Sequence, residues 1–235
     1  SAGHNLLNDT GVTRGDLIEA KMAVSLADII YKKLLNQNRK ALLVPNDLTL
    51  AQEIEWVNKR AKTEDLAVAV HFNNFNNQSV RGTETFYYRE QVLADVFAKK
   101  ISQALGIPNR GYKPDNKSAV GELGWLRKTV CRAVLVEVCF LTSDKDVAAL
   151  DYEKASNGFL AAINEIDPLI TVIAEEEKKK VLLTIANILN IIKGLLNKLS
   201  FSSMKNKFGG EETPKGGFSL TQKGNLITIA VSLIA

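Results

Sequence analysis

The sequence has few of the residues that form disulfides or metal clusters, with two cysteines and two histidines among 235 residues. Cys131 and Cys139 fall in one apolar segment that we predict to be a strand. Because a strand rises about 3.3 Å per residue, the eight positions between them separate the two thiols too far for a disulfide. We therefore expect both cysteines to be free and buried, and their spacing also excludes a zinc-finger pattern.

A strong charge of one sign is absent as well, since the net charge is +4 at pH 7. Lysine and arginine are scattered, and no basic stripe is interleaved with aromatic residues, so we expect no nucleic-acid partner. No secretory signal peptide is visible at the N-terminus. The longest apolar stretch near the C-terminus is interrupted by lysine and asparagine, so it is no clean membrane span. The composition is that of an ordinary globular protein.

The positions of the apolar residues predict strands that alternate with helices. Apolar residues recur every three or four positions in the helices, whereas two nearly continuous apolar runs indicate central strands covered on both faces. We expect an α/β domain with a central, mostly parallel twisted sheet flanked by helices. Predicted helices span 16–38, 48–62, 91–105 and 143–166, the last broken near 157–158; predicted strands span 41–44, 66–72, 83–88 and 132–140, and 109–123 is a loop.

The character of the chain changes near Pro168, which divides it into a domain of residues 1–168 and an extension of residues 169–235. Within the extension, residues 200–217 contain several glycines and one proline and are predicted to form a loop. Residues 225–235 form a short apolar end. The extension is too short for a second catalytic domain, so any chemistry belongs to the first domain.

One long amphipathic helix is predicted over 181–199 of the extension. Two roles are open for this helix. It could pack on the domain or self-associate as a short coiled coil, or it could dock a protein partner or a membrane surface. Its polar face is rich in asparagine and not strongly basic, which favours a packed or partner-bound helix over membrane contact.

Two histidines and two glutamates occupy positions suited to a metal site. His71 ends an apolar run at the carboxyl end of a predicted strand, where active sites gather in open α/β sheets. His4 follows Gly3, which permits a tight turn, and Glu19 begins the first amphipathic helix. Two imidazoles and one carboxylate make a catalytic zinc site with one position open for water. A second carboxylate such as Glu137 could handle the protons.

Each candidate also has a structural explanation. A single histidine at the end of a strand is more often a hydrogen-bonded structural residue, and His4 could be merely exposed. Asp16 and Glu19 have the spacing of a helix-capping pair, in which Glu19 would bond a backbone N–H. Glu137 lies inside an apolar strand and needs a partner, because an unpaired buried charge is costly. The arginines that could pair with it are Arg81, Arg110, Arg127 and Arg132.

The order and context of these residues resemble a known family. Over roughly residues 1–168, the chain is similar to the zinc-dependent N-acetylmuramoyl-L-alanine amidases of the type 3 amidase family. Six ordered matches carry the resemblance: Ser1-Ala2-Gly3-His4-Asn5, Asp16-Leu17-Ile18-Glu19, Ala69-Val70-His71-Phe72-Asn73, Gly82-Thr83-Glu84-Thr85-Phe86-Tyr87-Tyr88, Asn109-Arg110-Gly111 and Leu135-Val136-Glu137-Val138-Cys139-Phe140-Leu141. The chain departs from the family pattern at Ser1, Asn5 and Cys139, where the family has Asp, Gly and Gly, and none of these is a metal ligand.

The resemblance implies a fold, a metal and a substrate. His4, Glu19 and His71 would hold Zn²⁺, and Glu137 would move the proton during hydrolysis of the amide bond between N-acetylmuramic acid and L-alanine in peptidoglycan. Arg110 is the candidate for holding a substrate carboxylate, with a structural ion pair as the alternative. For Asn73 the roles are substrate contact or a turn in the loop. Such an enzyme acts at the bacterial cell wall, as a phage lysin or an autolysin, and would reach it by lysis or as part of an assembly.

Two other functions fit the same residues. A zinc peptidase or carboxypeptidase that cleaves wall peptides would use the same metal ligands. A non-catalytic, wall-binding component of a phage-like assembly would keep the fold alone, although retention of every ligand argues against it.

Overall fold

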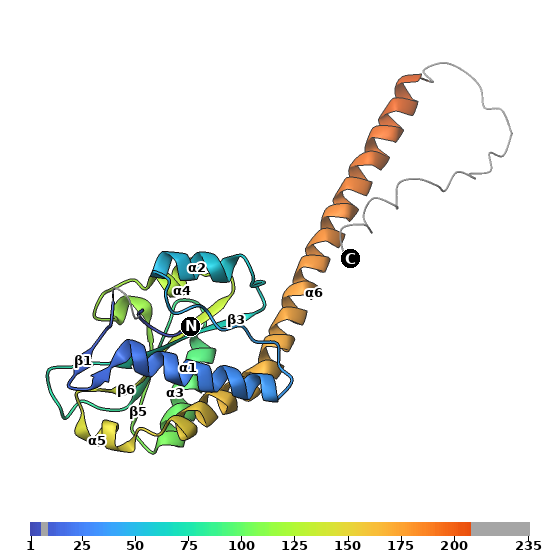
Figure 1. Cartoon of the computed structure of the whole chain (residues 1–235). Coiled ribbons are helices and arrows are strands. Elements are labelled where there is room, and N and C mark those ends of the chain that lie inside the picture. The colour runs from blue at the N-terminus through green and yellow to red at the C-terminus, as the bar shows by residue number, and fades with distance from the viewer. Residues whose placement is uncertain (6–8, 208–235) are drawn as a thin grey trace. The chain divides into compact units, whose positions relative to one another are not determined.

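The computed structural model describes the backbone of residues 1–5 and 9–207, and the side chains of residues 1–5, 9–167 and 179–195. The chain divides into two compact units, Ser1–Lys178 and Lys179–Ala235. The first unit contains a four-stranded mixed sheet with helices on both faces (Figure 1). The predicted α/β fold class, a mostly parallel sheet flanked by helices and followed by a helical extension, is confirmed.

The sheet is built from β3 (Leu66–Asn73), β4 (Thr83–Tyr87), β5 (Asn109–Pro114) and β6 (Arg132–Phe140). Its strand order is β3-β6-β4-β5. β3 runs parallel to β6 and β4 runs parallel to β5, whereas β4 is antiparallel to β6. The predicted central position of the apolar run in β6 is therefore correct, whereas that of the run in β3 is wrong, because β3 lies at the edge of the sheet. The outer edge of β3 is paired through a single bridge, between Ala2 and Val70.

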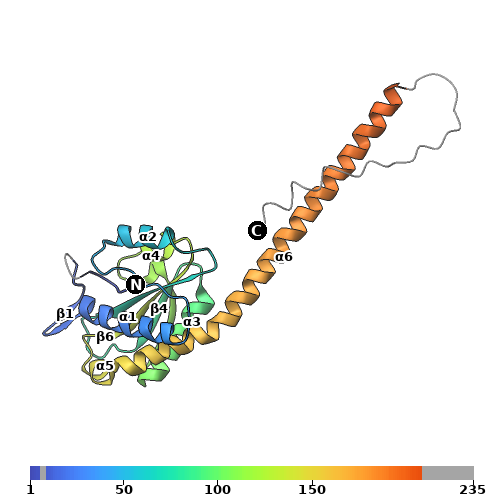
Figure 2. The ribbon, with the colours of Figure 1, turned by 45° about the vertical axis from the view of Figure 1, so that its right-hand side comes forward.

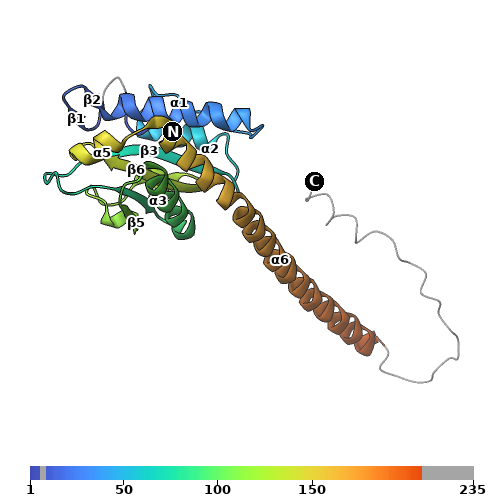
Figure 3. The ribbon, with the colours of Figure 1, turned by 90° about the horizontal axis from the view of Figure 1, so that it is seen from below.

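Three helices cover one face of the sheet: α1 (Glu19–Asn36), α3 (Gln91–Leu105) and the first part of α6 (Tyr152–Lys207). Figure 3, the view from below, shows α3 in front of the strands and α1 along the upper side of the picture. Their apolar side chains meet those that the strands direct to this face, including Val70, Phe72, Val134, Val136 and Val138. Because burying apolar surface contributes roughly 25 cal/mol per Å², this larger cluster is the main core.

Two shorter helices, α2 (Leu50–Asn58) and α4 (Gly124–Lys128), cover the opposite face and lie at the top of Figure 2. Ile54, Trp125 and their neighbours pack there against Ala69 and Leu135. Side chains alternate between the faces of a strand, so the residues two positions after Ala69 and Leu135 also face this side. Those residues are His71 and Glu137, which are paired in register. The apolar layer thus gives way to polar groups at the carboxyl ends of β3 and β6.

Two local predictions are wrong. Residues 41–44 form no strand, although Val44 is buried in the smaller cluster under α2. Residues 109–123, predicted to be a loop, contain β5 and the short helix η1 (Asp115–Lys117). Both errors have the same kind of cause: a strand needs a hydrogen-bonded partner, which 109–114 has in β4, and local periodicity does not report such pairing.

The predicted helix break near 157–158 is also misplaced. The break lies between α5 (Asp144–Ala149) and α6, and α6 continues through Gly158. A Cβ atom at Gly158 would lie 2.9 Å from the Cα atom of Ile101 and 3.1 Å from the Cβ atom of Ala104. The glycine therefore serves close packing of α6 on α3 and does not end the helix. A further small element, not predicted, is the sheet formed by β1 (Thr13–Arg14) and β2 (Leu17–Ile18).

The second unit contributes residues 179–195 of α6, whose side chains are all exposed. Many of them are apolar: Val181, Leu182, Leu183, Ile185, Ile188, Leu189, Ile191, Ile192 and Leu195. Within the part of the chain that the structure describes, no helix combines the length and the apolar character needed to cross a bilayer. Self-association of this helix or docking of a partner stays a prediction.

Three further predictions concern the start, the loop and the end of the extension. The domain boundary predicted at residue 168 falls inside α6. Residues 200–207, predicted as part of a loop, are helical. The predicted apolar end, 225–235, lies outside the described residues.

Candidate metal centre and its neighbouring carboxylates

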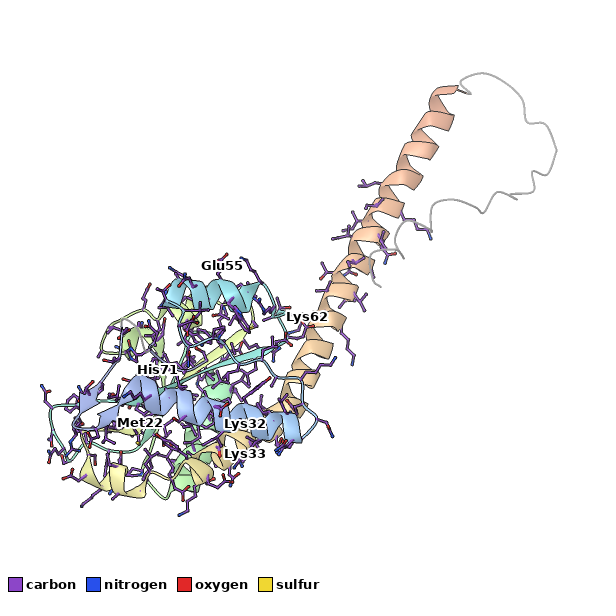
Figure 4. All side chains as sticks on the ribbon, in the orientation of Figure 1. Met22, Lys32, Lys33, Glu55, Lys62 and His71 are labelled. Carbon is purple, nitrogen blue, oxygen red and sulfur yellow. The ribbon has the colours of Figure 1, made fainter. Side chains whose placement is uncertain are left out.

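The N-terminal segment places His4 beside the end of β3. Ala2 forms a parallel bridge with Val70, the N–H of Gly3 donates to the carbonyl of Val70 over 2.6 Å, and Val70 donates back to Ser1 over 3.0 Å. His4 then adopts the left-handed region with φ of +62°. Such a conformation is unfavourable for a residue with a side chain and is held by its surroundings, here at a candidate site. His71 (labelled in Figure 4) lies near the end of β3, and the centre of its ring is 5.1 Å from that of His4.

Two glycines give the imidazoles room. A Cβ atom on Gly3 would lie 2.3 Å from the Cε1 atom of His71, so the ring of His71 rests directly against the backbone of Gly3. A Cβ atom on Gly11 would lie 2.6 Å from both the Oε2 atom of Glu19 and the Cδ2 atom of His4. Gly11 also has φ of +65°, a conformation that side chains disfavour. The glycine in the His4 motif is therefore needed for space rather than for a turn.

Glu19 is the buried member of the group, with its side chain 3% exposed. It opens α1, but the helix has no side-chain cap, so the predicted capping role is wrong. Its carboxylate accepts instead from the backbone N–H of Val12 over 2.9 Å and from that of Phe72 over 3.0 Å. These bonds fix Glu19 at the junction between the N-terminal loop and the end of β3.

His4, Glu19 and His71, here named the histidine cluster, are the group among the described residues that could hold a metal ion, with one ligand atom of each within 4.8 Å of the others. The Nε2 atom of His4 lies 3.3 Å from Oε2 of Glu19, and Nδ1 of His71 lies 3.1 Å from Oε1. Ligands at about 2.1 Å from a tetrahedral ion lie roughly 3.4 Å apart. Two imidazoles and a carboxylate at these separations fit a zinc ion.

When no metal is present, the negative charge of Glu19 and the positive charge of His4 stabilise each other. The hydrogen bond to Glu19, acting against desolvation by burial, raises the pKa of His4 to about 9. Burial alone would raise the pKa of Glu19, but hydrogen bonds from His4 and His71 hold it well below its ordinary value. Glu19 is therefore ionised at neutral pH and His4 carries the compensating proton.

Asp9 orients His4 from the outer side. Its Oδ2 atom lies 2.9 Å from Nδ1 of His4, and the hydrogen bond holds the pKa of Asp9 below its ordinary value. A carboxylate on one ring nitrogen directs the other nitrogen toward a metal, an arrangement common around histidine ligands. Sequence reasoning missed both Asp9 and Gly11, because their roles depend on the path of the N-terminal loop.

Glu137 lies next to the histidine cluster without a partner of its own. Its Oε2 atom is buried and has no hydrogen-bond partner among the described residues. Burial raises the pKa of Glu137 well above its ordinary value, and the negative charges of Glu19 and Glu84 add to this effect. The predicted ion pair with an arginine does not form: Arg81, Arg110 and Arg127 bind Asp146, Glu84 and Asp115 respectively, and the Nη1 atom of Arg132 is buried without a partner.

Arg110 and Asn73, the two residues predicted to bind substrate, meet on Glu84. The Nε atom of Arg110 donates to Oε2 of Glu84 over 2.7 Å, and the amide of Asn73 donates to Oε1 over 2.9 Å. Lys113 donates to the same Oε2 atom over 2.7 Å. Sequence reasoning missed Glu84 and Lys113, although a glutamate between two threonines in a strand is the same kind of signal that drew attention to Glu137.

Sequence comparison matches one protein family over most of the chain. A family model described as N-acetylmuramoyl-L-alanine amidase matches residues 1–165. The N-acetylmuramoyl-L-alanine amidase LytC of Bacillus subtilis (strain 168) is 26% identical over 149 residues, which are 60% of this chain and 29% of that protein. The matches to curated relatives cover 25% to 40% of the length of those proteins.

Solved structures share the fold. The catalytic domain of CwlV, an N-acetylmuramoyl-L-alanine amidase from Bacillus (Paenibacillus) polymyxa var. colistinus, aligns with a TM-score of 0.61 and 24% identity, covering 69% of this chain and 93% of that chain. An N-acetylmuramoyl-L-alanine amidase from Clostridium difficile 630 aligns with a TM-score of 0.61 and 20% identity, covering 70% and 92%.

Proposed function

Because the chain belongs to the N-acetylmuramoyl-L-alanine amidase family, type 3, we propose that it is a zinc-dependent hydrolase of the amide bond between N-acetylmuramic acid and L-alanine in peptidoglycan. The observation that carries this proposal is the meeting of His4, Glu19 and His71 beside the unpartnered carboxyl group of Glu137. The proposed place of action is the bacterial cell wall. The mildly positive net charge suits an anionic wall polymer.

The histidine cluster would hold the zinc ion through one nitrogen of each imidazole and the carboxylate of Glu19. When bound, zinc supplies Lewis acidity, which makes water acidic near neutral pH and polarises an amide carbonyl. Glu19 is fixed by two backbone N–H groups, and Asp9 holds the ring of His4. The ligands are thus oriented before any metal arrives, which reduces the ordering needed on binding.

Glu137 would act as the general base and then as the general acid. Its raised pKa makes the ionised carboxylate a stronger base than an ordinary glutamate, suited to take the proton of the attacking water. The same group would then deliver that proton to the departing nitrogen of L-alanine. Its Oε2 atom makes no hydrogen bond with the described residues, so no bond at that oxygen lowers the basicity of the carboxylate.

The proposal is tested by separating metal loss from base loss. Glu137→Gln is expected to lower the rate of amide hydrolysis by at least about 100-fold while the protein retains zinc, because only the proton transfer is lost. Chelation is expected to abolish the activity, and added zinc to restore it. The measurements are release of amino groups from purified peptidoglycan and metal content by mass spectrometry. Lys59→Met on the exposed surface of α2, where Lys59 pairs with Glu55 (labelled in Figure 4), is the matched control.

The products distinguish this proposal from its alternatives. Glycan strands freed of intact stem peptides support the amidase. Shortened stem peptides would identify a peptidase, and full activity after both chelation and Glu137→Gln would contradict a metal-dependent mechanism. A purified protein that binds peptidoglycan, does not bind zinc and does not cleave peptidoglycan would be a wall-binding component.

A further inference from the structure

The polar residues near Glu137 form one row across the sheet. Glu137 on β6 is paired in register with His71 on β3 and with Glu84 on β4. Residues paired across neighbouring strands project to the same face, so all three side chains lie on the face of α2 and α4. Lys113 on β5 is paired with Phe86, two residues beyond Glu84, and therefore shares that face. The row runs from the histidine cluster at one end to basic side chains at the other.

Glu84 holds the basic side chains at this second end. Its carboxylate is buried, with the residue 4% exposed, whereas the side chains of Arg110 and Lys113 are 31% and 34% exposed. Burial alone would raise the pKa of Glu84, but hydrogen bonds from Lys113 and Arg110 keep it below its ordinary value. Glu84, Arg110 and Lys113, here named the cation cluster, thus combine one negative and two positive charges. The net positive charge lies on the exposed side.

The contacts of Arg110 orient its guanidinium. It bonds Glu84 through Nε, and its Cζ atom lies 5.0 Å from the centre of the Phe140 ring. The terminal nitrogens of the guanidinium are not part of the contact with Glu84. A guanidinium fixed in this way presents the paired donors that match a carboxylate. A purely structural neutralisation of Glu84 needs one cation, and the cluster has two.

We propose that the cation cluster binds the free α-carboxylate of the second residue of the stem peptide, an inference that rests on the proposed amidase function. In peptidoglycan that residue is joined to the next through its side-chain carboxyl group, so its α-carboxylate is either free or amidated. Strands lie about 4.8 Å apart, which puts Glu84 roughly 10 Å from His71 along the row. An extended peptide advances up to about 3.6 Å per residue. The second residue therefore reaches the cation cluster when the scissile amide lies at the histidine cluster.

The charge count favours a carboxylate of this kind. Two cations beside one buried carboxylate leave a single positive charge, which matches a monoanion. An amidated substrate would leave that charge unpaired and desolvated, so the site would discriminate against it. Lys113 and Arg110 would thereby determine which chemical form of the wall the enzyme accepts.

The test is a binding measurement without turnover. The full chain is freed of metal by a chelator and titrated in a calorimeter with two synthetic muramyl peptides that differ only in a free or amidated second α-carboxyl group. We expect the free form to bind about tenfold more tightly, as for one charge-assisted hydrogen bond. Lys113→Met is expected to remove most of that preference, because it weakens binding of the free form and relieves the unpaired charge that disfavours the amidated form. Lys59→Met, which removes an equally charged but remote side chain, should keep the preference.

The outcomes separate this inference from the proposed function. Equal affinity for the two peptides, in a chain that hydrolyses peptidoglycan when zinc is restored, overturns the carboxylate site alone. Absence of both binding and hydrolysis overturns both proposals. If Lys113→Met lowers the thermal unfolding temperature, Arg110→Gln provides the second variant. Equal loss of affinity for both peptides in each variant would identify the cation cluster as structural.

Discussion

Glu19 and Glu84 are both buried carboxylates kept ionised beside Glu137, but they differ in the groups that hold them. Glu19 meets two histidines, whose charge depends on pH and which become metal ligands when neutral. Glu84 meets an arginine and a lysine, two cationic side chains that are not among the usual metal ligands. The comparison indicates that one end of the row can exchange protons for a metal ion, whereas the other end presents paired cations to an anion.

The largest expected effect separates the two carboxylates directly. Glu19→Gln removes an anionic ligand and should weaken zinc binding by more than about 100-fold. Mutation of residues that merely orient ligands already lowers metal affinity by about 10- to 100-fold. Glu84→Gln should keep zinc affinity within a few-fold of the original. Competition with a coloured chelator measures both. Comparable losses in the two variants would show that the two ends of the row do not have separate roles.

A smaller effect is expected from the residue that orients His4. Asp9→Asn weakens the bond to Nδ1 and should lower zinc affinity by roughly tenfold. The matched control is Asp28→Asn on α1, which removes an exposed carboxylate bonded to Lys32 (labelled in Figure 4). The same chelator competition measures both variants. If the control loses as much zinc affinity as Asp9→Asn, Asp9 has no specific role in orienting His4.

The mildest change is a shift of pH, to which only the histidine end should respond. In the metal-free protein the pKa of His4 is raised from 6.5 to about 9, so its stabilising contribution is fully present below about pH 6.5 and is lost as pH rises through about 9. A metal must displace that proton. Zinc affinity should therefore rise by up to about tenfold per pH unit between pH 7 and 9, while the stability of the metal-free protein falls.

Two measurements check these opposite trends. Chelator competition at pH 7 and 8 gives the affinity, and thermal unfolding of the metal-free chain gives the stability. A zinc affinity that does not change over this interval would contradict the assignment of His4 as the protonated partner of Glu19.

The sequence predicted those features of the fold and the site that depend on local residue pattern. The apolar runs predicted β3 and β6 because strands covered by helices need little polar alternation. The free, buried state of Cys131 and Cys139 is confirmed, since their separation along one strand was sufficient to exclude a bridge. The four residues named for metal and proton chemistry do lie together, because strand ends and the start of α1 converge at one edge of the sheet.

Other features depended on contacts distant in the chain. β5 forms because β4 offers it an edge, and Glu84 joins the site because its strand runs antiparallel to β6. The position of Asp9 next to His4 accompanies the bridge between Asn5 and Asp9. Pairing of this kind is set by the whole fold, so no local spacing predicts it.

A single substitution at Gly3 would affect one end of the polar row and spare the other. A single methyl group at this position would occupy the place of the His71 ring, 2.3 Å from Cε1, and would leave the cation cluster on the far strand untouched. Under the proposed function, an alanine there would displace a zinc ligand and remove hydrolysis, while the proposed carboxylate site would stay in place.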